Sequence, residues 1–209
     1  MNEKKGLVIT YYPGCGGTYL EQFHDDGIKI KKLDQSNYRT EIRHPTDLEV
    51  ERYRDTIKTK GKYEHIMGPD FLVEKYKKSD IISINPDYPK NYIKAIEEAT
   101  ENYDIVLIYS DKTIKSIMYE FGIRFITIYP KKNLLNEYLG RLFNKYKDAK
   151  MSKTTLYFKL KSLYLCWKND MESVESENNG LELIRLEYDE YITDIMEYIK
   201  FRENIGWVD

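Results

Sequence analysis

The chain has 209 residues, 33% of them charged, and a net charge of only -2. This balance argues against nucleic acid or an anionic membrane as a partner, and the length suits one α/β domain with a buried core. The sequence has no run of about eighteen apolar residues and no secretory leader, so we expect a cytoplasmic protein without a membrane-bound part. Cys15 and Cys166 match no zinc-binding spacing, and a disulfide scaffold is not expected.

Apolar runs and helical periods alternate from the beginning of the chain. Residues 6–12 form a short β-branched run ended by Pro13, which predicts a buried strand. Residues 17–23 predict the first turns of a helix that stops by Gly27. The alternating apolar and lysine residues of 28–34 predict a second strand with one solvent-exposed face.

Residues 35–80 are polar and show no strong strand period. Helices are expected near 47–58 and 70–77. We therefore predict a small helical insertion, about residues 35–80, over one edge of the sheet of a single domain spanning 1–209.

The second half continues the alternation of helix and strand. Strands are predicted at 104–110, 123–130 and 181–187, because these segments are short and rich in apolar residues. Helices are predicted at 85–103 (with Pro89 near the start), 112–122, 133–146, 153–173 and 191–201. The residues expected to face the core are Tyr92, Ile93, Ile96, Ala99, Ile114, Ile117, Met118, Phe121, Leu134, Leu135, Tyr138, Leu142, Leu156, Leu160, Leu163, Trp167 and Met171. Gly122 is the expected stop of one of these helices and Asn133 the expected N-cap of another.

Polar residues follow the predicted strands at the points where the strands end. Alternating strands and helices predict a parallel sheet covered by helices on both faces, and ligands of such sheets bind beyond the carboxyl ends of the strands. Asp34 follows the second strand, Ser110 and Asp111 follow the third, and residues 130–132 follow the fourth. We expect them to converge with the loop after the first strand on one edge of the sheet.

That loop, within "YYPGCGGTYL" at residues 11–20, resembles the phosphate-binding pattern G-x-x-x-x-G-K-[ST]. Glycines allow the backbone to wrap a phosphate, and a hydroxyl at position 18 is suited to Mg²⁺. Tyr11 stands in place of the first glycine and Gly17 in place of the lysine. The predicted phosphate-binding residues are Pro13, Gly14, Cys15, Gly16, Gly17 and Thr18, with Thr18 as the magnesium ligand. The alternative is a glycine-rich turn without a ligand.

The missing lysine bears most directly on catalysis. Losing one charged hydrogen bond weakens binding by roughly 10- to 150-fold, and that lysine also offsets charge during phosphate transfer. If the protein is active, another cation must replace it. The candidates are Lys31, Lys32, Arg39, Lys131, Arg141 and Lys145.

The stretches "YPGCGGTYL", "LDQSNY", the block of residues 85–142 and "EYDEYITDIM" resemble small P-loop proteins of bacteriophages and bacteria that are similar to adenylate and other nucleoside monophosphate kinases. The resemblance covers most of the chain except residues 40–80. It implies a three-layer P-loop fold with five parallel strands in the order 2-3-1-4-5, and ATP and Mg²⁺ as cofactors.

The resemblance also implies roles for individual residues. Asp34, Asp111 and Arg141 would be catalytic, with Arg141 clamping a transferred phosphate, and Ser36 and Arg39 would bind the acceptor. For three of these residues a structural role remains open: Asp34 can solvate a turn, Asp111 can cap the helix after it, and Arg141 can form a surface salt bridge. Cys15 could be a thiol of low pKa, although a nucleophilic role is not expected.

Three functions stay open from the sequence. The first is a kinase that transfers phosphate from ATP to a nucleoside or deoxynucleoside monophosphate or a similar small acceptor. The second is a catalytically impaired binder of a nucleotide or phosphorylated small molecule, with a regulatory or partner-binding role. The third is a structural or protein-interaction role without a nucleotide.

Overall fold

The computed structural model describes residues 5–22, 27–60, 69–147, 152–177 and 183–203. The chain forms two compact units, the first made of residues 1–35 and 93–209 and the second of residues 36–92. The second unit contains most of the insertion predicted from the sequence.

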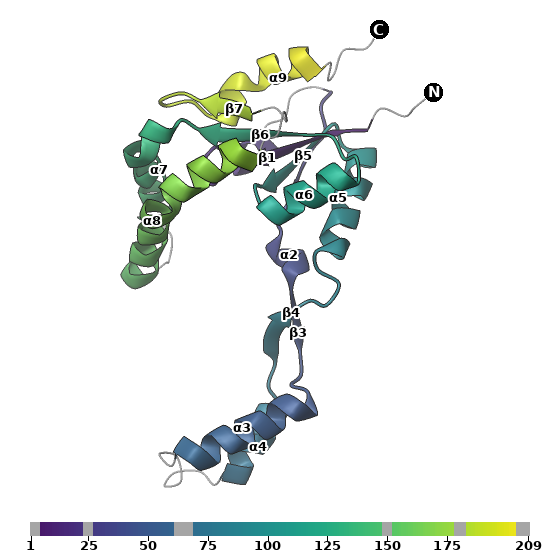
Figure 1. Ribbon diagram of the computed structural model, residues 1–209, viewed down its shortest axis with the longest axis vertical. Helices are drawn as coiled ribbons and strands as arrows, with labels where there is room; N and C mark the ends of the chain where they lie inside the picture. The colour runs from purple at the N-terminus through teal and green to yellow at the C-terminus, as the bar shows by residue number, and fades with distance from the viewer. Residues whose placement is uncertain (1–4, 23–26, 61–68, 148–151, 178–182, 204–209) are drawn as a thin grey trace. The chain divides into compact units, whose positions relative to one another are not determined.

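A parallel sheet of five strands organises the first unit (Figure 1). Its strands are β1 (Leu7–Tyr11), β2 (Ile30–Leu33), β5 (Ile105–Tyr109), β6 (Phe125–Pro130) and β7 (Leu183–Leu186). They lie side by side in the order β2-β5-β1-β6-β7. Counted in chain order within this sheet alone, the order is 2-3-1-4-5, so the predicted α/β fold and its strand order are confirmed.

The central strands are apolar because helices cover them on both faces. All five residues of β1 and all six of β6 are buried. Two polar side chains also lie inside, and they bond to each other: the Thr10 hydroxyl lies 2.9 Å from that of Thr127 and also donates to the carbonyl of Ile126. Buried hydroxyls need such partners, so this pair does not weaken the core.

Helices flank the sheet, with α9 on one side and α5 and α6 on the other (Figure 1). The helical elements of the first unit are α1 (Gly17–Glu21), α5 (Lys90–Asn102, which begins in the second unit), α6 (Lys112–Glu120), η1 (Lys132–Leu134), α7 (Leu135–Lys147), α8 (Lys153–Glu177), η2 (Ile192–Ile195) and α9 (Met196–Glu203). Among the helices described, none combines the length and the apolar character needed to cross a membrane. The predicted end of the first helix falls partly on residues 23–26, outside the described residues.

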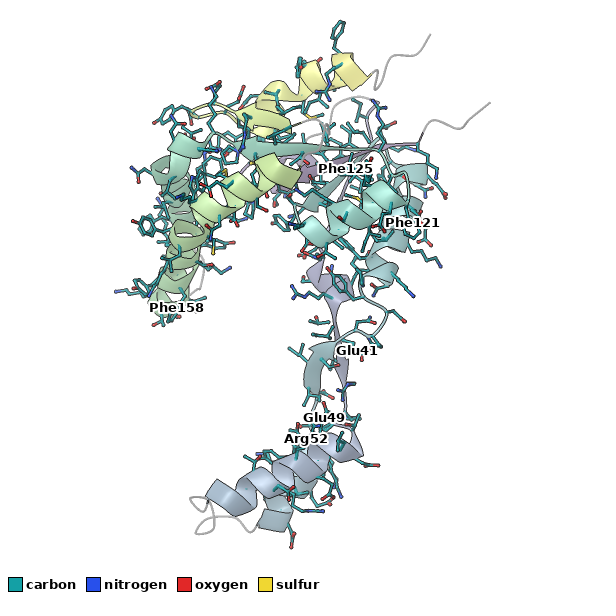
Figure 2. The ribbon with its side chains drawn as sticks, viewed as in Figure 1. Glu41, Glu49, Arg52, Phe121, Phe125 and Phe158 are labelled. Atoms are coloured by element: carbon teal, nitrogen blue, oxygen red, sulfur yellow. The ribbon has the colours of Figure 1, made fainter. Side chains whose placement is uncertain are left out.

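Several predicted core and cap positions differ from the structure. Phe121 is 65% exposed, because α6 ends at Glu120 and Phe121 is its C-cap, turned away from the helix's buried stripe (Figure 2). Asn133 does not cap a helix; it lies inside the short turn η1, whose N-cap is Lys131. Five other residues predicted to face the core are only half-buried: Ile117, Leu135, Leu142, Leu156 and Leu160.

The second unit contains two strands that the sequence pattern did not reveal. Its elements are α2 (Ser36–Arg39), β3 (Thr40–Arg43), α3 (Asp47–Lys60), α4 (Pro69–Lys77) and β4 (Ile81–Ile84). β3 and β4 pair antiparallel, and Ile42, Ile82 and Ile84 on this ribbon are at least 70% exposed. Strands of four residues with exposed isoleucines lack the buried alternation by which strands are recognised. A small core of Val50, Ile57 and Val73 holds α3 against α4, beside the stacked rings of Tyr53 and Tyr76.

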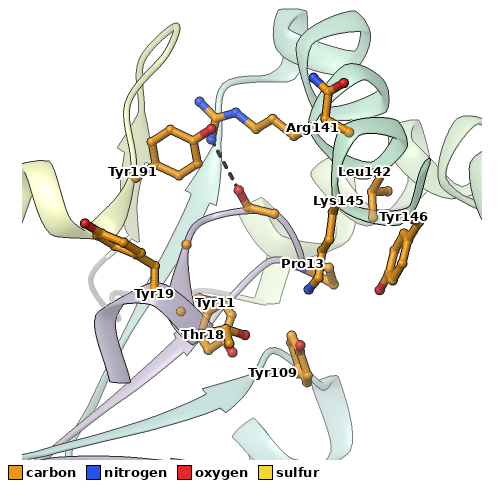
Figure 3. A pocket seen from close by; sticks show the side chains of 14 residues that line it. Tyr11, Pro13, Thr18, Tyr19, Tyr109, Arg141, Leu142, Lys145, Tyr146 and Tyr191 are labelled. Atoms are coloured by element: carbon orange, nitrogen blue, oxygen red, sulfur yellow. Dashed lines mark hydrogen bonds between the residues drawn. The ribbon is translucent and has the colours of Figure 1, made fainter. Parts of the chain in front are cut away.

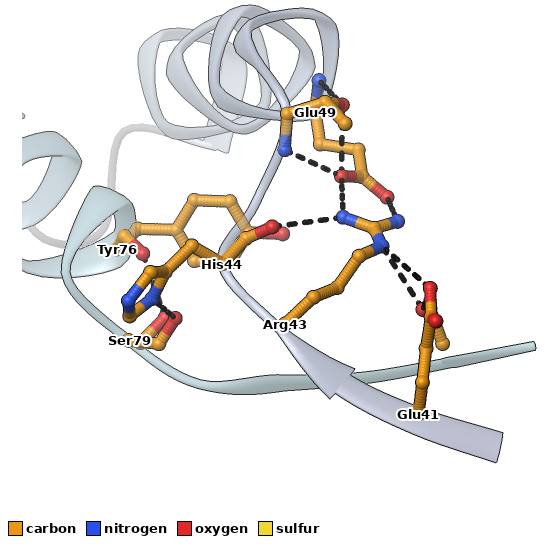
Figure 4. Close-up of polar contacts among 8 residues, drawn as sticks. Glu41, Arg43, His44, Glu49, Tyr76 and Ser79 are labelled. Carbon is orange, nitrogen blue, oxygen red and sulfur yellow. Dashed lines mark hydrogen bonds and ion pairs between the residues drawn. The ribbon is translucent and has the colours of Figure 1, made fainter. Parts of the chain in front are cut away.

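A network around Glu49 joins β3 to the start of α3 (Figure 4). The Arg43 guanidinium donates to both carboxylate oxygens of Glu49, at 2.8 and 2.9 Å. Thr46 and Glu49 form a reciprocal capping box: the Thr46 N–H donates to Glu49 at 2.8 Å, and the Glu49 N–H donates to the Thr46 hydroxyl at 3.4 Å. The bonds from Arg43, followed by those from Thr46, lower the pKa of Glu49 to about 2.

We expect the second unit to lose stability in acid as this carboxylate is protonated. The folded pKa of Glu49 lies below its unfolded value, so its contribution is complete above about pH 4.5 and is lost as the pH falls towards about 2. Hydrogen exchange of the α3 amides can be measured from pH 6 to pH 2.5. After correction for the pH dependence of the intrinsic exchange rates, the protection of these amides in wild type should fall as the pH is lowered. Glu49→Gln should remove this acid-dependent loss of protection, whereas Glu51→Gln, on the same helix, should keep it. Equal acid profiles for wild type and Glu49→Gln would contradict the assignment.

Candidate functional site

The glycine loop joins β1 to α1 at the carboxyl end of the sheet, as predicted. Gly14 and Gly16 have φ angles of 98° and 91°, a region that side chains rarely tolerate. A Cβ atom at Gly14 would also lie 3.0 Å from the ring of Tyr138, and one at Gly16 would lie 3.1 Å from the ring of Tyr191. Both glycines are therefore required by the backbone and by the rings packed against it.

Two distant segments hold the loop in place (Figure 3). Arg141, on α7, donates to the Gly14 carbonyl at 3.3 Å, and the Ile192 N–H donates to the Cys15 carbonyl at 3.0 Å. The same guanidinium nitrogen of Arg141 donates to the Glu190 carbonyl at 3.0 Å. The loop, α7 and the segment before η2 thus form one connected structure.

A pocket of about 340 Å³ opens beside this loop (Figure 3). Its volume lies within the range of small-molecule sites. The described residues that line it, among which there is no aspartate or glutamate, are Tyr11, Pro13, Gly14, Gly16, Gly17, Thr18, Tyr19, Tyr109, Arg141, Leu142, Asn144, Lys145, Tyr146 and Tyr191. The predicted loop residues other than Cys15 therefore line the pocket.

Tyr11 occupies the space that a side chain at position 17 would need. A Cβ atom on Gly17 would lie 2.3 Å from Cζ and 2.6 Å from the hydroxyl of Tyr11. The Tyr11 side chain is only 2% exposed, and its ring packs against that of Tyr109 with the centroids 5.1 Å apart. The two departures from the phosphate-binding pattern are thus one structural feature, because the tyrosine at position 11 excludes the lysine at position 17.

Two lysines are placed at or beside the pocket. Lys145 lines it from α7. The Lys32 ammonium, from β2, donates to the Thr18 hydroxyl at 2.8 Å and lies 5.4 Å from the ring centroid of Tyr109. Within the described residues, neither ammonium forms an ion pair with a carboxylate. Unpaired ammonium groups beside a pocket attract anions.

Arg141 is mostly committed to contacts within the protein. Its side chain is 9% exposed, forms an ion pair with Glu137 one turn earlier, and stacks on Tyr191 with 3.9 Å between the guanidinium carbon and the ring centroid. It also donates to the Tyr138 hydroxyl at 3.3 Å. Its predicted catalytic role stays a prediction, but the residue clearly holds the loop in its present position.

The other predicted catalytic and substrate-binding residues are not among the described residues that line the pocket. Asp111 caps α6: one oxygen accepts the Ile114 N–H at 3.1 Å and the other accepts Gln35 at 3.3 Å. Asp34 is exposed at the end of β2. Ser36 and Arg39 belong to the second unit and are also exposed. The roles assigned to these four residues stay predictions.

Cys15 is buried within the loop and is not the low-pKa thiol that the sequence suggested. Burial raises the pKa of its thiol to about 12, an effect only partly offset by a hydrogen bond with the Tyr138 hydroxyl, 3.5 Å away. Burial also raises the pKa of Tyr138 and, together with Asp170, that of Tyr12. These groups are neutral at ordinary pH, so the cluster behind the loop is a packing element.

The residues around Thr18 fit a magnesium ion poorly. Mg²⁺ takes oxygen ligands and is usually held by one or two carboxylates in addition to phosphate oxygens. In the described part of the chain, no three histidine, cysteine or acidic side chains are grouped to hold a metal. The hydroxyl of Thr18 already accepts a hydrogen bond from an ammonium group.

The tyrosines of the pocket were not recognised as site residues from the sequence. Tyr109 is the last residue of β5, which lies beside β1, and it pairs with Tyr11. Its place at the carboxyl end of a strand next to the glycine loop could have identified it as a site residue. Tyr146 and Tyr191 come from α7 and from the start of η2. No local pattern connects these segments with the loop.

The fold and site together define an α/β protein with a glycine-rich loop and a pocket at the carboxyl edge of a five-stranded parallel sheet. No protein-family model matches the chain, and no curated protein matches it. Among solved structures, a gluconokinase from Sinorhizobium meliloti 1021 is similar, with 9% identity and a TM-score of 0.45. The match covers 98% of this chain and 97% of that one.

Proposed function

We propose that this protein binds a phosphate-bearing small molecule, in the simplest case a nucleotide, in the pocket beside residues 13–18, and that it does so without transferring the phosphate. The observation that carries the proposal is a glycine loop with a left-handed backbone at Gly14 and Gly16, together with two nearby lysines that lack acidic partners among the residues described. Positive charge without a paired carboxylate suits an anionic ligand.

The tyrosines of the pocket support a ligand that also carries a flat ring. Tyr109, Tyr146 and Tyr191 line the same cavity as Lys145. Aromatic side chains offer faces for stacking, and small-molecule sites combine such apolar walls with a few polar groups. A nucleotide has both parts, with a phosphate for the lysines and loop and a base for the rings.

The pairing of Tyr11 with Gly17 supports binding over catalysis. A kinase of this class uses the lysine of the loop to stabilise charge on the transferred phosphate. Here the tyrosine ring fills the space where that lysine would begin. The pocket also lacks an acidic side chain among its described lining residues, and a base or metal ligand for transfer would have to come from elsewhere.

Isothermal titration with ATP, ADP, AMP and pyrophosphate tests the binding proposal. We expect saturable binding of ATP or ADP, and Lys145→Met should weaken it by roughly 10- to 150-fold, the loss associated with one charged hydrogen bond. Lys147→Met is the matched control: it removes the same charge two residues further along α7, outside the pocket lining. The control should bind as wild type does.

The same preparations distinguish a binder from a kinase. Transfer of labelled phosphate from ATP to nucleoside or deoxynucleoside monophosphates should remain at background. Transfer above background would overturn the non-catalytic part of the proposal and favour the kinase hypothesis. Absence of binding to all four ligands would overturn the binding proposal itself.

A further inference from the structure

Lys32 brings a positive charge to the end of the glycine loop from a different strand. Its ammonium lies 2.8 Å from the Thr18 hydroxyl, the group that a loop of this kind offers to magnesium. Lys32 is at the third position of β2, which is two strands away from β1 in the sheet. The charge that is missing at position 17 is therefore present near the loop, carried by another part of the chain.

An aromatic pair explains how this arrangement is held. The Tyr11 ring covers Gly17, the Tyr109 ring packs against Tyr11 at 5.1 Å, and the Lys32 ammonium lies over Tyr109 at 5.4 Å from its centroid. An ammonium over a tyrosine face is attracted by the ring. Tyr109 thus supports both the residue that excludes the usual lysine and the lysine that takes over its charge.

The same position is unfavourable for a divalent cation. Lys32 takes one of the two lone pairs of the Thr18 hydroxyl, and a metal bound through the other would lie next to a like charge. The neighbouring pocket wall provides no carboxylate among the residues described. Since Mg²⁺ gives up its water reluctantly, a pocket whose described lining has no acidic side chain, with an ammonium group adjacent, will hold it weakly.

We propose that Lys32 replaces the divalent cation at this loop, so that the phosphate-bearing ligand binds free of metal and Mg²⁺ does not improve its affinity. This inference rests on the proposed function, because it concerns how the same ligand is held. Lys32 is a binding residue here: its ammonium pairs with a phosphate oxygen while it keeps its contact with Thr18.

The test is titration of ATP into the full chain in EDTA and, separately, in excess Mg²⁺. Wild type should bind metal-free ATP at least as tightly as Mg·ATP. Lys32→Met should weaken metal-free ATP by roughly 10- to 150-fold. In that variant Mg²⁺ should now strengthen binding, a reversal that a purely structural role of Lys32 would not produce.

Two further variants keep the test decisive. Lys31→Met removes the neighbouring lysine, whose side chain points to the opposite face of β2, and it should behave as wild type. Lys32→Arg keeps the charge and should stay within about threefold of wild type, which separates charge from folding if Lys32→Met is unstable. Tighter binding of Mg·ATP than of ATP by wild type, or unchanged affinity in Lys32→Met, would overturn this inference and leave the proposed function standing. Absence of binding in both buffers would overturn both.

Discussion

Introducing a lysine at position 17 alone will destabilise the protein and will not recreate a working phosphate-binding lysine. Any side chain at this position begins with a Cβ atom 2.3 Å from Cζ of Tyr11, a buried ring that cannot move without disturbing Tyr109. Gly17 does not share the positive φ of Gly14 and Gly16, so the steric contact alone requires glycine here. Overfilling a packed site of this kind costs about 1–3 kcal/mol.

The smallest variant isolates this effect. Gly17→Ala should lower the free energy of unfolding by about 1–3 kcal/mol in urea titrations. Gly140→Ala on α7 is the matched control, because the added methyl group meets no described atom within 4 Å beyond its chain neighbours and the helix's own backbone. That control should gain about 0.5–1 kcal/mol, since alanine suits a helix better than glycine. Equal effects of the two substitutions would contradict the contact with Tyr11.

A double-mutant cycle assigns the cost to the tyrosine. In a Tyr11→Ala background the ring is gone, so adding a methyl group at position 17 should cost little. The coupling between the two positions should fall in the range of 0.5–3 kcal/mol expected for residues in contact. The same reasoning predicts that a lysine at position 17 can extend from the loop once the Tyr11 ring is removed, as in Tyr11→Gly combined with Gly17→Lys. A coupling near zero would show that Tyr11 does not limit position 17.

The sequence predicted the first unit well because its signals are local. Residues 104–110 and 123–130 are short apolar runs, and only strands covered on both faces can bury such segments fully. Proline and glycine mark the turns, as at Pro13 and Gly122. The strand order followed from the resemblance, and the parallel pairing of β1 with β5 and β6 confirms it.

Other features depend on contacts that a linear pattern does not contain. Tyr11 and Gly17 could be recognised as two departures from a motif, but their mutual exclusion requires knowing that the ring folds back over the loop. Lys32 was one of six candidate cations, and only its position at the end of β2 beside Thr18 distinguishes it. β3 and β4 were missed because their isoleucines are exposed, which removes the alternation that marks a strand.

Removing Arg141 is expected to have the largest effect on stability. Its side chain is 9% exposed and that of its partner Glu137 is 12% exposed, so the ion pair is nearly buried. In the described part of the structure, Arg141→Met leaves the Glu137 carboxylate with one hydrogen-bond donor, the Asp189 N–H at 2.9 Å. Deleting one partner of such a pair costs about 3–5 kcal/mol. Urea unfolding should show this loss, whereas Lys147→Met at the exposed end of α7 should stay within about 1 kcal/mol of wild type.

Removing both partners separates stability from positioning. A buried pair replaced by apolar side chains of similar volume is often neutral or stabilising, so Arg141→Met with Glu137→Met should recover most of the lost free energy. In the described structure, Nε of Arg141 and Oε2 of Glu137 are buried without hydrogen-bond partners, which makes the pair a poor source of stability. The Gly14 carbonyl would still lack its donor in the double variant. Titration should therefore find weakened ATP binding in the double variant although its stability is restored, because the main role of Arg141 is to position the glycine loop. Recovery of full ATP affinity in the double variant would instead assign Arg141 to packing alone.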